Sequence, residues 1–204
     1  MTKHRLELFS DGVFAIVLTL LVLDLRVPTD HGLAGLVQIA PALLVHAATF
    51  FVVGVFWQMH HGAFARVTEI RSHTLLLNLL ALFWITLLPF AAKNAAERPL
   101  EPLGASLLSA CCGLHLISVI AVRLSAHSTI DDNLQMRAWR TGRVRLAAAV
   151  SLGDLACAAL AWESPWFGYA GALVTIAIVL ALPSPPDVEQ AFQRQAALSA
   201  ASEP

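Results

Sequence analysis

The feature that most constrains the fold is a succession of long segments that carry almost no charge. Six such stretches follow one another along the chain: residues 12–23, 33–65, 72–92, 102–122, 146–162 and 164–186. Only Asp154 interrupts the fifth stretch, and the others contain no Asp, Glu, Lys or Arg. A helix needs about 20 mostly apolar residues to cross a bilayer. The pattern therefore predicts an all-α integral membrane protein with six transmembrane helices.

The same pattern predicts where the helices begin and end. We expect the first helix to run from about Arg5 to Val27. Pro41 suits the first turn of a helix, where its missing N–H costs nothing, so the second helix is expected to begin near residues 38–41. The fifth stretch is short for a span. Residues 1–183 form the predicted transmembrane unit, and residues 184–204 are expected to be a polar, largely disordered cytoplasmic tail.

Composition excludes several classes of function. Hydrophobic residues make up 57% of the chain and charged residues only 13%, about half the usual share for a soluble domain, so a lipid bilayer is the expected surroundings. A net charge of −1 argues against a nucleic-acid partner. The sequence has no HExxH motif, no nucleophile elbow and no histidine pair at i+3 or i+4. We therefore expect no catalytic residue and no cofactor, and buried, reduced cysteines that serve packing.

The basic residues predict the orientation. With six spans, ten of them share the side of the N-terminus: Lys3, Arg5, Arg66, Arg71, Arg123, Arg137, Arg140, Arg143, Arg145 and Arg194. Only Arg26, Lys93 and Arg98 fall on the other side. Because Lys and Arg are retained on the cytoplasmic side of membrane proteins, both termini are expected in the cytoplasm.

The first predicted helix, RLELFSDGVFAIVLTLLVLDL, opens with an unusual polar group. Ser10 and Asp11 sit in its early turns, where free backbone N–H groups favour an anion, so capping alone is one explanation. Further along, three apolar residues recur on one helical face with a hydroxyl at its border: Ile16, Leu20 and Leu23, with Thr19. Such a stripe alone predicts little, because a helix in a bilayer is apolar on every side.

Partners for the polar group are available in the next two spans. The motif FWQMHH places Trp57, His60 and His61 at the cytoplasmic end of the second span, and Asn78 lies about one turn inside the third. We expect a hydrogen-bonded network of Arg5, Ser10, Asp11, a histidine and Asn78 that fixes the rotation of the first helix. The two histidines could instead sense pH, because imidazole titrates near neutrality.

These segments resemble the transmembrane protein 175 family of potassium channels. The family signature, Arg-x-x-x-Phe-Ser-Asp at the start of the first helix, corresponds to Arg5, Phe9, Ser10 and Asp11. The segments FWQMHH and LNLLALFWITLLPF extend the resemblance through the third span, whereas the last three spans agree only in length and hydropathy. A length of 204 residues with six spans is similar to one prokaryotic unit.

The resemblance implies a homotetramer in the bacterial inner membrane, with four copies of the first helix around a pore for K⁺. It places the constriction at Ile16 and further pore-lining positions at Thr19, Leu20 and Leu23. The family lacks the TVGYG filter of ordinary potassium channels, and no such segment occurs here. The implied mechanism is a hydrophobic constriction that excludes water and ions when closed. No metal is expected beyond the permeating K⁺.

Other features leave alternatives open. Asp24 could form a ring of carboxylates at the outer mouth or simply pair with Arg26. Asp154 is costly in lipid and should face protein or a cavity. Together with midplane histidines such as His115 it could serve a secondary transporter, and His46 and His115 could equally be packing residues. A purely structural membrane protein, with the polar group acting only as a cap, is a further alternative.

Overall fold

The computed structural model describes residues 2–23, 25–64, 70–125 and 134–181. Within these ranges the regular secondary structure is helical. Its elements are α1 (Lys3–Leu23), α2 (Gly32–Phe64), α3 (Ser72–Thr86), α4 (Leu88–Glu97), α5 (Pro102–Ser125), α6 (Leu134–Leu160) and α7 (Pro165–Ala181). Four segments of the described chain are long and apolar enough to cross a membrane: α1, α2, α3 joined with α4, and α5. Helix α7 is apolar but shorter.

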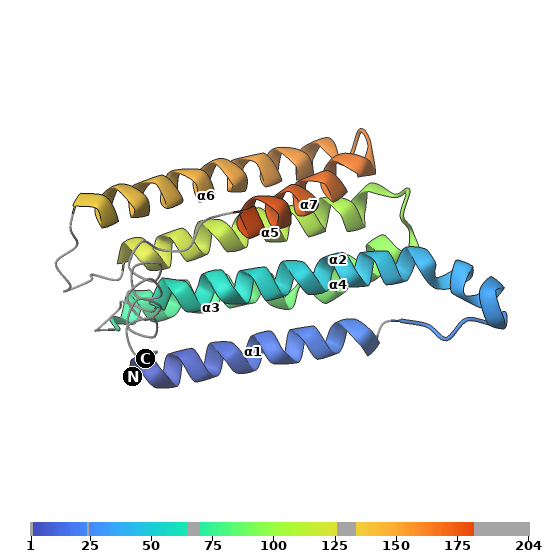
Figure 1. The fold of residues 1–204 in the computed structure, drawn as a ribbon, viewed down its shortest axis with the longest axis horizontal. Coiled ribbons are helices and arrows are strands. Elements are labelled where there is room, and N and C mark those ends of the chain that lie inside the picture. Colours follow the sequence, from blue (N-terminus) through green and yellow to red (C-terminus); the bar gives the residue numbers. More distant parts are fainter. Residues whose placement is uncertain (1, 24, 65–69, 126–133, 182–204) are drawn as a thin grey trace, which may run out of the picture.

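The helices lie side by side in an elongated bundle (Figure 1). Helix α5 packs against α3, α4, α6 and α7 and so occupies the centre, whereas α1 packs against α2, α3 and α4 at one edge. Buried side chains of α1, α2, α4 and α5 form the main hydrophobic core, among them Phe14, Phe56, Leu88 and Leu116. Helix α1 therefore has one packed face, and no helix of the described residues covers its other face.

A break separates α3 from α4 within the third predicted span. Leu87 stands between the two helices, and its N–H bonds to the carbonyl of Trp84 at 3.3 Å, a tight final turn. Pro89 follows in the first turn of α4. Proline has no N–H to donate to the carbonyl four residues earlier, Ile85, so the regular hydrogen-bond ladder stops there.

The second helix begins earlier than its proline suggested. Helix α2 runs from Gly32, and Pro41 lies inside it, so the expected start near residues 38–41 was wrong. Pro41 removes a single bond within the helix, to the carbonyl of Val37, and a proline can kink a helix without ending it. Gln38 also connects α2 to the residues before it. Its side-chain oxygen accepts the backbone N–H of Thr29 at 3.1 Å, and its amide donates to the Thr29 hydroxyl at 3.0 Å. These bonds hold the preceding connection against the first turns of α2.

Two other helix limits also differ from expectation. Helix α1 ends at Leu23 rather than near Val27, and the N–H of Leu25 bonds to the carbonyl of Val22, three residues earlier, at 3.2 Å. Helix α6 has 27 residues and begins at Leu134, well before the uncharged stretch that predicted a short span. Arginine is a good helix former, so the absence of charge marks the apolar part of a helix and not its end. The predicted tail, residues 184–204, lies outside the described residues.

Candidate functional site

Helix α1 presents two different faces. Its buried residues recur at intervals of three and four: Leu6, Ser10, Phe14, Val17 and Leu21. Phe14 is packed against the rings of His60 and His115, with centroid distances of 5.4 and 6.3 Å. This face is therefore fixed against the interior of the bundle.

The opposite face of α1 carries the predicted apolar stripe. Ile16, Leu20 and Leu23 are 59%, 43% and 76% exposed in the single chain. Thr19 is also exposed, and its hydroxyl donates to the carbonyl of Ile16 at 2.8 Å. The stripe is thus free to meet lipid, water or another copy of the chain.

The exposed line extends toward the N-terminus. Arg5, Phe9 and Gly12 precede Ile16 at steps of four, three and four residues, and all three are exposed. Steps of three and four keep residues on one side of an α-helix. Gly12 was not singled out in the sequence, although the same spacing points to it.

Two side-chain hydrogen bonds anchor the back of α1 to its neighbours. Trp57 of α2 donates its indole N–H to the carboxylate of Asp11, with a nitrogen–oxygen distance of 2.8 Å. Asn78 of α3 donates its side-chain amide to the hydroxyl of Ser10 at 3.1 Å, and that hydroxyl donates to the carbonyl of Leu6 at 2.9 Å. Ser10 and Asn78 are both buried. One bond to each neighbouring helix opposes rotation of α1 about its own axis.

The remaining members of the predicted network lie outside these bonds. Arg5 is exposed, and its side chain makes no hydrogen bond or ion pair with any residue in the described ranges. His60 is buried between Phe14 and Phe64, and neither of its ring nitrogens has a hydrogen-bond partner within the described part of the chain. His61 is exposed, with its ring centroid 6.0 Å from that of Trp57. Asp24 lies outside the described residues.

Asp154, on α6, is buried against α5 and α7. The sequence predicted a buried position, because a carboxylate exposed to lipid is energetically costly. Asp154 is 2% exposed, and its carboxylate accepts the hydroxyl of Thr175 at 2.8 Å. Ser109 donates to its backbone carbonyl at 2.9 Å. His115 is buried, and its ring nitrogen Nδ1 lies 3.0 Å from the carbonyl oxygen of Ala81. His46 is half-buried beside the ring of Phe50. Among the described residues, no three His, Cys, Asp or Glu side chains are grouped as metal ligands would be.

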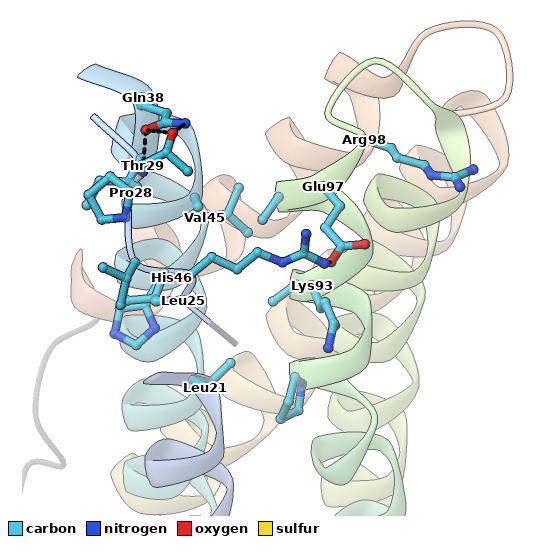
Figure 2. A pocket seen from close by; sticks show the side chains of 17 residues that line it. Leu21, Leu25, Pro28, Thr29, Gln38, Val45, His46, Lys93, Glu97 and Arg98 are labelled. Carbon is cyan, nitrogen blue, oxygen red and sulfur yellow. Dashed lines mark hydrogen bonds and ion pairs between the residues drawn. The ribbon is translucent and has the colours of Figure 1, made fainter. Parts of the chain in front are cut away.

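A cavity of about 720 Å³ opens where α1 leads into α2. We call it the rear cavity, because Leu21, on the buried face of α1, forms part of its wall. Figure 2 shows Leu25, Pro28 and His46 on one side and Lys93 and Glu97, from α4, on the other. Arg26 joins the two sides, since its guanidinium nitrogen lies 2.6 Å from a carboxylate oxygen of Glu97.

Comparison with known proteins places these features in a family. The family model described as the endosomal/lysosomal potassium channel TMEM175 matches residues 5–89. A potassium channel of Chryseobacterium is 34% identical over 134 residues, which cover 63% of this chain and 70% of the relative. A potassium channel of Chamaesiphon minutus is 32% identical over 191 residues, which cover 88% of this chain and 94% of the relative.

Comparison of the fold with solved structures identifies the same family. The crystal structure of a lysosomal potassium-selective channel TMEM175 homologue from Chamaesiphon minutus superposes with a TM-score of 0.66 at 26% identity, covering 87% of this chain and 96% of that one. The residues matched by the family model, 5–89, include Ser10 and Asp11 of α1 and their hydrogen-bond partners Asn78 and Trp57. This multi-pass membrane protein therefore belongs to the TMEM175 family, a family of ion channels.

Proposed function

We propose that the chain is a potassium-permeable channel in which four copies of α1 surround a central pore. The observation that supports this most strongly is the division of α1 into two faces. Its back is anchored by the Asp11–Trp57 and Ser10–Asn78 hydrogen bonds, and its front exposes Ile16, Leu20 and Leu23. A homotetramer would turn these fronts toward a common axis.

The constriction would be hydrophobic. Rings of four Ile16, Leu20 and Leu23 side chains would narrow the path and exclude water when the helices are close together. Opening would require α1 to tilt or rotate until a partly hydrated cation can pass. Potassium gives up its hydration water more easily than sodium, so a narrow apolar ring favours it. We expect the preference to be modest, because the sequence contains no TVGYG segment to replace the lost water.

Thr19 would add four hydroxyl groups beside the ring. Its hydrogen is engaged by the carbonyl of Ile16, which leaves the oxygen lone pairs available to a cation. K⁺ is the permeant ion of this proposal, and the conduction path needs no cofactor.

The proposed topology has six spans, with α3 and α4 counted as one and α6 and α7 as the last two. Both termini then lie in the cytoplasm of a bacterium, with the protein in its inner membrane. The excess of basic residues on the N-terminal side supports this orientation. Residues 1–183 would form the channel unit and residues 184–204 a cytoplasmic tail.

A secondary transporter that uses Asp154 and His115 is the alternative. The surroundings of Asp154 favour a structural role, because the residue is 2% exposed, its carboxylate is bonded to Thr175, and it does not line the rear cavity. A coupled binding site would need access from each side of the membrane in turn.

Potassium flux into liposomes tests the proposal. The wild type is compared with Ile16→Asn, Leu152→Asn, Asp11→Ala and Asp154→Asn in the full chain. Leu152 is a 67% exposed apolar residue on α6, a helix that does not line the proposed pore, so Leu152→Asn is the control for the introduced amide.

We expect non-saturating flux in the wild type. Ile16→Asn should raise this flux and cause the largest loss of preference for K⁺ over Na⁺, and the control variant should change neither. Asp11→Ala is expected to lower the preference less, because it frees α1 without widening the ring. Saturable flux that Asp154→Asn abolishes, with Ile16→Asn unchanged, would replace the channel with the transporter.

A further inference from the structure

The rear cavity lies directly behind the end of the helix that we propose to line the pore. Leu21 is 3% exposed and belongs to the packed face of α1, whereas Leu23 is 76% exposed on the opposite face. The cavity wall that includes Leu21 is therefore on the side away from the proposed pore axis. Movement of this end of α1 toward α4 would widen the pore, and movement away from α4 would narrow it.

The Arg26–Glu97 ion pair spans this cavity. Arg26 lies between Leu25 and Pro28, which Figure 2 shows on the wall opposite Glu97. Its side chain must therefore cross from the connection after α1 to α4 in order to reach the carboxylate at 2.6 Å. The ion pair resists further separation of the two walls, whereas the long and flexible Arg26 side chain can bend as the walls approach.

We propose that the Arg26–Glu97 ion pair is a tether that holds the end of α1 back from the pore axis and so favours the wider state of the pore. The direction of its effect on flux rests on the proposed function, whereas the mechanical role does not. Loss of the pair would let the ends of the four α1 helices move toward the axis, and the Leu23 ring would narrow.

The expected size of the effect follows from the exposure of the pair. The Arg26 side chain is 81% exposed and that of Glu97 41% exposed, so each pair is weak and screened by salt. If one pair favours the wide state by about twofold, four pairs that act together favour it by about 16-fold. A tether that is weak in one subunit is therefore measurable in a tetramer.

The test uses charge exchange in the full-length protein. Glu97→Gln and Arg26→Gln each remove the pair, and Arg26→Glu combined with Glu97→Arg restores it with the charges exchanged. Arg98→Gln is the matched control, because Arg98 also lines the cavity but pairs with Glu101 at 3.2 Å, three residues along the chain. Lys93, a further cation in the cavity wall, stays unchanged in every variant.

Two readouts are combined. Potassium flux into liposomes reports conduction, and distances between spin labels on Leu23→Cys report how far apart the four α1 ends lie. We expect Glu97→Gln and Arg26→Gln to lower flux by up to about 16-fold and to shorten the label distances, the charge exchange to reverse both, and Arg98→Gln to change neither.

Ionic strength provides an independent test of the ion pair. A rise from about 0.01 to 1 M choline chloride at constant K⁺ shortens the screening length from about 30 to 3 Å. It should lower the flux of the wild type toward that of Glu97→Gln and leave Glu97→Gln itself unchanged.

The outcomes separate the tether from the channel. Label distances that shorten in Glu97→Gln and return in the charge exchange, with no flux in any variant, would support the tether and refute conduction. Flux in the wild type with distances and flux unchanged in Glu97→Gln would overturn the tether and leave the channel intact. A charge exchange that restores neither readout would also overturn it.

Discussion

The hydrogen bond between Trp57 and Asp11 should contribute measurably to holding α1 in its orientation. Trp57→Phe removes the indole N–H and keeps an aromatic ring at the same position. The bond joins α2 to α1 at 2.8 Å, across 46 residues of sequence, and its acceptor is a carboxylate. Its loss leaves Asp11 without the donor that α2 supplies.

The magnitude follows from the acceptor and its exposure. A hydrogen bond to a charged group is worth about 1.5–3 kcal/mol, but Trp57 is 43% exposed, so solvent replaces part of the loss. Measured couplings between polar side chains in a membrane protein average about 0.6 and reach about 1.7 kcal/mol. We therefore expect a loss of about 1 kcal/mol per subunit, which for a chain of 204 residues lowers Tm by about 2–4 °C.

The assay is a double-mutant cycle of Trp57→Phe and Asp11→Ala, measured by thermal unfolding in detergent. Trp162→Phe is the control, because Trp162 is 65% exposed and its side chain makes no hydrogen bond within the described residues. The expected coupling free energy is about 1 kcal/mol. Additive effects of the two substitutions would mean that this bond does not hold α1, and the reasoning would be refuted.

Two further predictions concern the interior of the bundle. Thr175→Val removes the hydroxyl that donates to the Asp154 carboxylate at 2.8 Å. We therefore expect thermal unfolding to show a free energy of unfolding lower by about 1–3 kcal/mol, with potassium flux retained. Abolished flux without a loss of stability would favour the transporter. Gly113→Ala would place a methyl group 2.9 Å from the carbonyl oxygen of Ser151, so it should lower the free energy of unfolding by about 1–3 kcal/mol. The methyl group of Gly153→Ala meets nothing within 4 Å, so this control should be neutral or stabilising. Equal Tm values for the two variants would contradict the close approach of α5 and α6.

The sequence predicted the helical class and much of α1, because charge and residue identity carry that information directly. A long uncharged stretch is costly to expose to water, so it belongs in a bilayer or in a protein core. These stretches therefore predicted where the apolar helices lie. Trp57 and Asn78 were assigned to the surroundings of Ser10 and Asp11, and the structure joins the same residues by hydrogen bonds. Both assignments depended only on the expected position of each residue along its span.

Features that depend on side-chain reach or tertiary packing were not predicted. Pro41 lies inside α2, and Gln38 holds the preceding connection through its side chain, a bond that helix propensity does not predict. The Arg26–Glu97 pair joins residues 71 positions apart, and both side chains look like ordinary surface charges in the sequence. Arg5 was expected in the polar network, but it lies on the exposed face with Phe9 and Ile16, since periodicity in an apolar helix does not indicate which face is packed.

Cysteine accessibility along α1 tests the central claim most directly. Residues 15–23 are replaced one at a time by cysteine in a chain whose own Cys111, Cys112 and Cys157 are changed to alanine and whose flux matches the wild type. A thiol reagent is then applied during potassium flux. If α1 lines the pore with its exposed stripe, modification will reduce flux at positions 16, 19, 20 and 23 and leave it unchanged at the buried positions 17 and 21. Inhibition at positions 17 and 21, or at none of the nine positions while labelling is complete, would contradict the account.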